Sequence, residues 1–457
     1  MYVRRFVLVA ILAAALLASA CGRAPEDQAP PGPPPNVVIV MVDTLRADHM
    51  SLYGYDRHTT PFIRKFASES LVFAHARSQS ACTFPSVNSL LTSRYPVIFN
   101  RQEKGQLGIP EEIPAIAEIL KQNGYRTIAV SASPIVRATP SKYNPNGGFE
   151  RGFDEFIEGC VWRHGGCVNQ NVFEQLENIS EPFFLYIHYM EPHGYYAPPP
   201  NYKKQFAGEY DGHEFIRNGN PNPIAKMLYR DGPKVDITDR DMQHLVDLYD
   251  DEIRFFDSVF RRLIGRLEEK ELHDNTMFVI TGDHGEMFME HGQIKHCRGV
   301  WNTVTHVPLV LRIPGVEGGR RLPHAVQNLD IVPTLLDYLE IDTSSFGFEG
   351  GSLRPLIEGH DKKRRFAFAN QGYYRSVDDG RFHLIFENAT QELTLFDMRS
   401  DPLEQNDLYD PDHPEVGRLR EMLDLWLTNT GQLASLDEDL AAAKAKEDEL
   451  RALGYLQ

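Results

Sequence analysis

The sequence predicts an α/β fold in which a large mixed, mostly parallel sheet is flanked by helices and followed by a smaller C-terminal α+β subdomain. Apolar, β-branched runs at 36–43, 126–132, 183–189 and 275–281 are typical of strands that are buried on both faces. Segments with apolar residues at helical spacing separate these runs, which is the rhythm of βα units. After position 342 the runs become shorter and alternate, which indicates a small antiparallel sheet.

The overall composition is that of an ordinary globular protein with an acidic surface. The chain has 457 residues, of which 42% are hydrophobic and 24% are charged, and its formal net charge is −17. A protein that binds nucleic acid without sequence preference needs a basic surface to attract phosphate groups. We therefore expect no nucleic-acid partner.

The N-terminus is predicted to be a targeting segment. Arg4 and Arg5 precede an apolar run that ends in small residues directly before Cys21. This arrangement predicts a bacterial lipoprotein signal peptide over 1–20, a lipid on Cys21 that anchors the protein to a membrane, and a Pro-rich tether over 21–35. The alternative is an ordinary cleaved signal peptide followed by an incidental cysteine. The expected location is the bacterial cell envelope, facing the periplasm or the cell surface.

The elements of the predicted catalytic domain at 36–342 follow in order. Residues 60–76 predict a helix and a strand, 114–124 a helix, and 239–270 a long amphipathic helix. The predicted C-terminal subdomain at 343–430 contains the short alternating runs and ends in a helix at 414–428. The sequence of the charged, Ala-rich tail at 431–457 does not indicate a function for it.

The stretch at 78–96 contains a candidate nucleophile. Thr83 lies two residues before Pro85, at a predicted junction between a loop and a helix. The free N–H groups and the positive dipole end at the start of a helix favour a negatively charged substrate there. A hydroxyl in this position suits attack on an anionic ester, although a plain helix cap is the alternative.

Polar residues follow two of the predicted strands where those strands end. Asp43 follows the first strand, and Asp283 and His284 follow the fourth. In open α/β sheets this edge is where ligands bind. Together with Thr83 these residues predict a site for one divalent metal ion, for which Zn²⁺, Mn²⁺ and Ca²⁺ are the candidates.

Histidines and a lysine are concentrated after the third and fourth strands. They are His188, His193, His291, Lys295 and His296. We expect such a set to donate hydrogen bonds to a substrate oxyanion, with one member acting as a general acid.

The predicted envelope location is an oxidising compartment, which favours disulfide bonds among the cysteines that follow Cys21. Cys160 and Cys167 are close in sequence, so a disulfide that closes a small loop is the first expectation. Cys82 and Cys297 each neighbour a candidate site residue. Either these two form a disulfide between two site loops, or Cys82 is itself the nucleophile.

Several motifs together resemble the sulfatase family of the alkaline phosphatase superfamily over roughly residues 36–410. The matching stretches are VDTLRADH at 42–49, TFPSVNSLLTSRYP at 83–96, HYMEPH at 188–193, YDDEI at 249–253, TGDHGE at 281–286, EHG at 290–292 and HVPLV at 306–310. Their order and spacing are those of the family. The resemblance implies the family's fold, a divalent metal ion and an anionic ester substrate.

The resemblance also implies roles for individual residues. The implied metal ligands are Asp43, Thr44, Thr83, Asp283 and His284, and Thr83 matches the nucleophile. The implied catalytic groups that hold substrate oxygens or assist the leaving group are His193, Lys295 and His296. Arg46 matches a residue that supports the first metal loop, and we expect Arg46, His188 and His291 to contact the substrate.

Two departures from the family pattern affect the expected chemistry. Sulfatases carry a Cys that is converted to formylglycine within C-x-P-x-R, whereas this chain has Thr83 at the Cys position and Val87 at the Arg position. Cys82 lies one residue too early. The sequence therefore predicts a metal-dependent hydrolase of sulfate or phosphate esters that forms a covalent ester on Thr83. The alternatives are an envelope phosphoethanolamine or phosphoglycerol transferase, and a catalytically inactive binding protein with this fold.

Overall fold

Strand β1 (Asn36–Val42) lies in the interior of the main sheet, and all seven of its residues are buried. Alternate residues from Val38 to Val42 pack into the hydrophobic core on one face of the sheet. Those from Val37 to Met41 pack into the core on the other face. Because successive side chains of a strand point to opposite faces, a strand that is covered on both sides needs apolar residues at every position.

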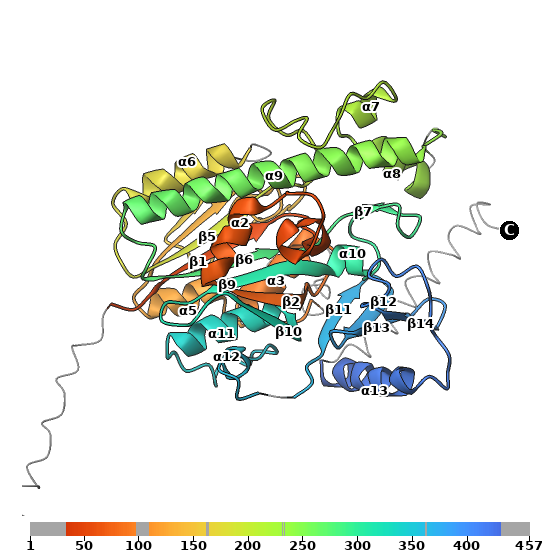
Figure 1. Cartoon of the computed structure of the whole chain (residues 1–457). Helices are drawn as coiled ribbons and strands as arrows, with labels where there is room; N and C mark the ends of the chain where they lie inside the picture. The colour runs from red at the N-terminus through yellow and green to blue at the C-terminus, as the bar shows by residue number, and fades with distance from the viewer. Residues whose placement is uncertain are drawn as a thin grey trace, which may run out of the picture. The chain divides into compact units, whose positions relative to one another are not determined.

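The main sheet has eight strands in the order β10-β2-β9-β6-β1-β5-β3-β4 (Figure 1). The other strands are β2 (Leu71–Arg77), β3 (Arg126–Ser131), β4 (Glu155–Ile157), β5 (Phe183–Tyr189), β6 (Thr276–Gly282), β9 (His306–Arg312) and β10 (Arg320–Gln327). Strand β9 runs antiparallel to both of its neighbours, β2 and β6, and the remaining neighbours are parallel. The mixed, mostly parallel sheet that the sequence predicted is therefore confirmed.

Helices cover both faces of this sheet (Figure 1). One face carries α2 (Pro61–Phe66), α6 (Gly165–Leu176) and α9 (Asp239–Glu269). The other face carries α3 (Thr83–Thr92), α5 (Ile116–Gln122), α11 (Ile331–Tyr338) and α12 (Arg354–Ile357). The start of α9 is stabilised by a capping box, in which the Thr238 hydroxyl accepts a hydrogen bond from the backbone N–H of Asp241.

Shorter elements complete the main part of the chain. They are α7 (Glu214–Arg217), α8 (Asn222–Tyr229), α10 (Asn302–Thr305), the hairpin β7 (Met287–Phe288) and β8 (Ile294–Lys295), and the 3-10 helices Ala47–His49, Ser51–Tyr53, Ala67–Glu69 and Asn328–Asp330.

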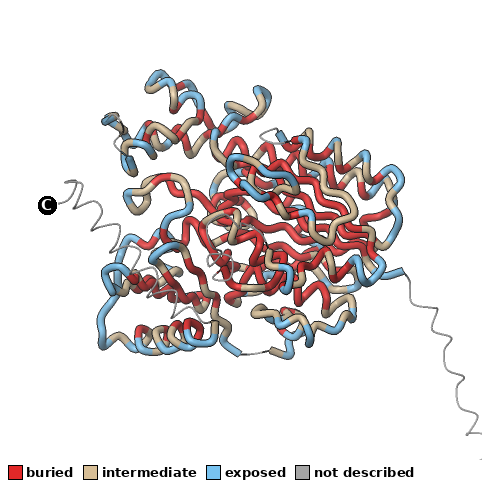
Figure 2. Tube along the Cα trace, turned by 180° about the vertical axis from the view of Figure 1, so that it is seen from behind, coloured by how far each residue is buried: buried red, intermediate tan, exposed pale blue. Residues whose placement is uncertain are grey.

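The C-terminal part is a four-stranded antiparallel sheet with one helix. Its strands are β11 (Ala367–Gln371), β12 (Tyr374–Asp378), β13 (Phe382–Glu387) and β14 (Glu392–Asp397), and the helix is α13 (Pro414–Asn429). Leu419 and Leu423 of α13 share a hydrophobic core with strand residues of this sheet. A buried ion pair between Arg77 of β2 and Asp378 of β12, at 2.7 Å, joins the two sheets. The predicted small antiparallel sheet is confirmed, and Figure 2 shows buried residues running along both sheets.

The computed structural model describes residues 33–96, 109–160, 164–230, 232, 234–361 and 363–430. The predicted signal peptide at 1–20, Cys21, most of the tether and the tail at 431–457 lie outside these residues. Within the described ranges, no helix combines the length and the apolar character needed to cross a membrane.

Candidate active site

Two carboxylates meet at the carboxyl edge of the main sheet. Strands β1 and β6 are parallel neighbours in which Val42 pairs with Gly282, so the residues that follow them, Asp43 and Asp283, lie side by side. The backbone N–H of Thr44 donates to Oδ1 of Asp283 at 3.0 Å. Thr44 has a φ of 56°, a left-handed conformation that is unusual for a residue with a side chain and typical of functional sites.

His284 points its Nε2 atom at this pair of carboxylates. Its Nδ1 lies 2.8 Å from the carbonyl oxygen of Gly285, so Nδ1 carries the proton and Nε2 presents a lone pair. Nε2 lies 3.4 Å from Oδ2 of Asp283, 4.0 Å from Oδ1 of Asp43 and 3.1 Å from Oγ1 of Thr83. Four predicted ligand atoms are thus brought together from three different loops.

Glycine at position 285 is required by close packing around this loop. A Cβ atom there would lie 2.1 Å from the carbonyl oxygen of Thr303. The Gly that follows Asp283 and His284 therefore lets the ligand loop pack directly against a neighbouring segment.

The arrangement fits a divalent cation. Oδ1 of Asp43 and Oδ2 of Asp283 are buried, and neither has a hydrogen-bond partner among the described residues. Burial and the neighbouring Asp283 raise the pKa of Asp43. Ligand atoms about 2.0–2.2 Å from a cation such as Zn²⁺ lie roughly 3–3.5 Å from each other, which is close to the separations around Nε2 of His284. The Thr44 hydroxyl is also buried and has no partner among the described residues, so its role as a ligand stays a prediction.

His188 lies behind Asp43 and does not line the cavity. The Tyr186 hydroxyl lies 2.9 Å from Nδ1 of His188, and burial raises the pKa of Tyr186, so the phenol stays protonated and donates to Nδ1. Nε2–H of His188 then donates to Oδ2 of Asp43 at 3.3 Å. Burial lowers the pKa of His188 to about 4, which keeps the ring neutral. The side chain supports Asp43 instead of contacting substrate as the sequence predicted.

Arg46 is also a supporting residue. Its guanidinium donates to both carboxylate oxygens of Asp48, at 2.9 Å and 2.7 Å, and also pairs with Glu290. It further donates to the carbonyl oxygen of Glu286 at 2.9 Å. These bonds join the loop after β1 to the loop after β6, which agrees with the support of the first metal loop that the resemblance implied. Arg46 does not line the cavity, and its predicted contact with the substrate stays a prediction.

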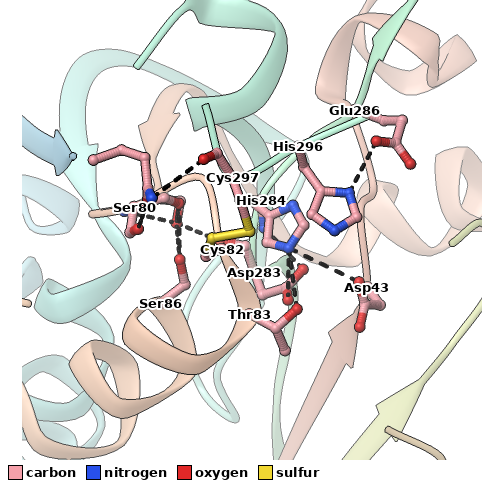
Figure 3. The surroundings of a disulfide bond; sticks show 12 residues. Asp43, Ser80, Cys82, Thr83, Ser86, Asp283, His284, Glu286, His296 and Cys297 are labelled. Atoms are coloured by element: carbon pink, nitrogen blue, oxygen red, sulfur yellow. Dashed lines mark hydrogen bonds and ion pairs between the residues drawn. A yellow bond between two sulfur atoms is a disulfide. The ribbon is translucent and has the colours of Figure 1, made fainter. Parts of the chain in front are cut away.

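A disulfide between Cys82 and Cys297 lies next to Thr83 (Figure 3). Cys82 is the residue before α3 and Thr83 is the first residue of that helix. The backbone N–H of Cys297 also donates to the carbonyl oxygen of Ala81 at 2.7 Å. The predicted disulfide is confirmed, and Cys82 has no thiol free for nucleophilic attack in this structure. The second predicted disulfide, Cys160 to Cys167, is present as well.

His296 is oriented by a buried carboxylate. Its Nδ1 lies 2.9 Å from Oε1 of Glu286, whose other oxygen accepts from the Tyr196 hydroxyl at 3.0 Å. Burial opposes ionisation of Glu286, but the charge of His296 and its hydrogen bond lower the pKa of Glu286 to about 2. Figure 3 shows the His296 ring between Glu286 and the ring of His284, and the two imidazole centroids are 4.6 Å apart.

The site opens into a cavity of about 950 Å³. Five of the predicted site residues line it, namely Asp43, Thr83, His193, Lys295 and His296. Burial, followed by the charge of His296, lowers the pKa of His193 to about 3, so this ring is neutral. The Lys295 ammonium donates to Oδ1 of Asn222 at 2.9 Å and supplies a positive charge at the cavity wall.

His291 lies elsewhere. Its ring stacks on Trp301 with 4.0 Å between centroids, and it is not part of the cavity lining. The predicted substrate contact of His291 stays a prediction that this position does not support.

Sequence reasoning missed two residues that hold the predicted ones in place. Glu286 directly follows the Asp283-His284-Gly285 run, and its position next to two predicted metal ligands could have identified it as a site residue. Asn222 lies in a Pro- and Asn-rich stretch that carries no recognisable pattern.

Comparisons with known proteins agree with the geometry. A family model described as Sulfatase matches residues 35–341, and one described as N-sulphoglucosamine sulphohydrolase, C-terminal, matches residues 289–430. An N-acetylglucosamine-6-O-sulfatase of Bacteroides thetaiotaomicron is 22% identical in an alignment of 468 positions, gaps included, which covers 82% of each protein.

Two solved structures share the fold. The phosphonate monoester hydrolase of Agrobacterium radiobacter has a TM-score of 0.68 at 19% identity, covering 89% of this chain and 96% of that chain. A structure in complex with its substrate D-glucosamine-2-N,6-O-disulfate has a TM-score of 0.70 at 18% identity, covering 87% of this chain and 98% of that chain.

Proposed function

Because the chain belongs to the sulfatase family of ester hydrolases, we propose that it is a metal-dependent hydrolase that cleaves sulfate or phosphate esters with Thr83 as the nucleophile. The observation that carries this proposal is the position of the Thr83 hydroxyl. Its oxygen lies 3.1 Å from Nε2 of His284, at the start of a helix and on the wall of the cavity.

Asp43, Asp283 and His284 would hold the divalent cation. When bound, the cation would lower the pKa of the adjacent Thr83 hydroxyl and offset negative charge on the ester group. The free N–H groups at the start of α3 and the ammonium of Lys295 favour the anionic ester in the same place.

The reaction has two steps at the sulfur or phosphorus atom. In the first, Oγ1 of Thr83 gives up its proton to the cavity water and forms a bond to that atom, and the bond to the ester oxygen breaks. The departing alcohol takes a proton from the imidazolium of His296, whose ring Glu286 holds in place through Nδ1. In the second step the neutral His296 accepts a proton from water, whose oxygen attacks the same sulfur or phosphorus atom. The bond from that atom to Oγ1 of Thr83 breaks, Oγ1 takes a proton back from the cavity water, and sulfate or phosphate leaves.

The choice between sulfate and phosphate esters rests on the nucleophile. One similar protein is an N-acetylglucosamine-6-O-sulfatase, and a solved structure with the same fold is a phosphonate monoester hydrolase. Esters of sulfur acids and of phosphorus acids are therefore both named among the substrates of proteins similar to this chain. Threonine has no route to formylglycine, which removes the usual sulfatase nucleophile. We propose that the protein turns over phosphoester substrates at least as well as sulfate esters.

We also propose that the enzyme works at the bacterial cell envelope, anchored by a lipid on Cys21. The support is the Arg-rich start, the apolar run that ends in small residues before Cys21, and the Pro-rich stretch that follows. Radiolabelled palmitate incorporation that is lost in Cys21→Ser tests the anchor.

Steady-state kinetics test the proposed chemistry. Matched aryl sulfate, phosphate monoester and phosphodiester substrates are compared with the wild type, Thr83→Val and Thr83→Ser. Val has the shape of Thr without the hydroxyl, so kcat should fall by roughly 10³-fold or more, whereas Ser should retain measurable turnover. Undiminished turnover by Thr83→Val would show that another group is the nucleophile.

A further inference from the structure

A second group of acidic residues lies on the wall of the same cavity. Glu191 belongs to the loop after β5, Glu252 lies on α9, and His164 is the residue before α6. The side chains of both glutamates are almost fully buried, at 4% exposure. The elements that carry these three residues are far apart in sequence, so no linear motif joins them.

Each glutamate has one oxygen bound by the backbone and one without a partner. The backbone N–H of Gly165 donates to Oε1 of Glu191, and that of Ala197 donates to Oε1 of Glu252 at 2.8 Å. Oε2 of Glu191 and Oε2 of Glu252 are buried and have no hydrogen-bond partner among the described residues. Buried polar atoms in folded proteins are nearly always paired, so these two oxygens indicate a missing positive ligand.

His164 supplies a nitrogen atom beside the glutamates. Its Nδ1 lies 3.7 Å from Oε1 of Glu191, and its ring packs edge-on against Phe255 with 5.5 Å between centroids. One ligand atom from each of the three residues lies within 4.8 Å of the others. Phe255 and Glu252 are on the same helix, so α9 positions both the carboxylate and the ring.

We propose that Glu191, Glu252 and His164 bind a second divalent cation, separate from the one at Asp43 and Asp283. Two carboxylates and one imidazole favour Zn²⁺ or Mn²⁺, and water in the open cavity can complete the coordination. The sequence predicted one metal ion, because the second set of ligands becomes visible only in three dimensions.

A metal ion explains the site better than an ammonium group of a substrate. Oε2 of each glutamate is buried, so a small bare cation can reach these atoms more easily than the ammonium group of a substrate. An imidazole nitrogen is a good metal ligand, whereas it adds little to the binding of an ammonium group that already has two carboxylates.

Metal stoichiometry tests this proposal without an activity assay. The full chain is stripped with a chelator, titrated with Zn²⁺ or Mn²⁺ by calorimetry, and analysed for retained metal by mass spectrometry after dialysis. We expect two equivalents for the wild type and one for Glu191→Gln/Glu252→Gln. Asp43→Asn/Asp283→Asn should keep one equivalent, which separates the two sites. Glu209→Gln, at an exposed acidic residue, is the control and should keep both.

His164→Ala guards against a folding defect in the double variant. The side chain of His164 is half exposed, at 53%, so its loss should leave the fold intact while weakening the second equivalent at least about tenfold. The proposal is overturned if Glu191→Gln/Glu252→Gln binds as many equivalents as the wild type. It is also overturned if that variant keeps its metal and loses affinity only for amine-bearing esters, because the pair would then bind a substrate ammonium.

Discussion

Two pairs of buried carboxylates lie at one cavity, which Asp43, Glu191 and Glu252 line, and the two pairs are built in different ways. Asp43 and Asp283 follow neighbouring parallel strands, so the strand register brings them together. Glu191 and Glu252 come from a loop and a helix, and backbone N–H groups of two further segments hold them. Burial and the neighbouring carboxylate raise the pKa of Asp43 in the first pair and of Glu252 in the second.

The difference lies in what surrounds each pair. The first pair has the Thr83 hydroxyl and the start of α3 beside it, together with the positioned imidazoles of His284 and His296. Beside the second pair lies His164, whose side chain is half exposed. Under the two proposals above, the first pair serves the reaction and the second pair only binds a cation.

Neutralising one carboxylate of each pair should separate these roles most strongly. In Asp283→Asn, kcat/KM should fall by roughly 10⁴-fold, or about 5 kcal/mol, because the cation beside Thr83 loses a charged ligand. In Glu252→Gln the loss should stay below about tenfold, because Glu252 is not among the residues that we assign to the reaction. Equal losses of kcat/KM in the two variants would contradict the division of roles.

The two disulfides should differ in their contribution to stability. Cys82 and Cys297 are 215 residues apart, whereas Cys160 and Cys167 are 7 apart. In the chain-entropy model, replacing the first bridge by serines should cost about 5 kcal/mol of unfolding free energy and replacing the second about 2 kcal/mol. Urea denaturation measures both. A larger cost for the short loop would mean that native contacts, and not loop length, set the order.

Glu286→Gln examines the positioning of His296 in the first site. The amide still accepts a hydrogen bond but has no charge, so we expect kcat to fall about 10- to 100-fold with little change in KM. Glu290→Gln, which changes a carboxylate in the same loop that pairs with Arg46, is the control and should leave kcat closer to the wild type.

The same variant has a pH signature in stability. The pKa of Glu286 is lowered from 4.5 to about 2, so its ionised form stabilises the fold above pH 4.5, and this contribution is lost as the pH falls towards about 2. Wild-type stability should therefore decline more steeply than that of Glu286→Gln across this range in acid denaturation. Parallel curves would show that the carboxylate does not contribute through its charge.

The smallest expected effect is the change in unfolding free energy caused by Glu252→Gln in the absence of metal. Removing one charge from a buried pair of like charges should raise the unfolding free energy of the chelated protein by about 1 kcal/mol. Added Zn²⁺ or Mn²⁺ should stabilise the wild type more than the variant, as measured by thermal unfolding. A destabilised variant in chelator would indicate that the pair is held by protein contacts alone.

The sequence predicted the parts of the fold that have strong local patterns. The continuous apolar runs of β1 and β5, the amphipathic α9 and the helix α13 were identified close to their observed limits. Strands β9 and β10 were not predicted, because each contains a proline, and the register of β10 shifts near its own proline.

The sequence also predicted those site residues that follow elements with strong local patterns. Asp43, Asp283 and His284 follow strands, and parallel strands bring their carboxyl ends to one edge. His188 and His291 were assigned to substrate because they lie in matching motifs, but neighbouring side chains direct one to Asp43 and the other to Trp301. Such orientations depend on packing across the chain, which no local pattern encodes.

Trapping the covalent intermediate tests the central claim most directly. The enzyme is mixed with a phosphate or sulfate ester, quenched with acid during turnover, digested and analysed by mass spectrometry. We expect a phosphoryl or sulfuryl group on Thr83 in the wild type and none in Thr83→Val. Turnover with an unmodified Thr83, or a modification on another residue, would contradict the assignment of Thr83 as the nucleophile.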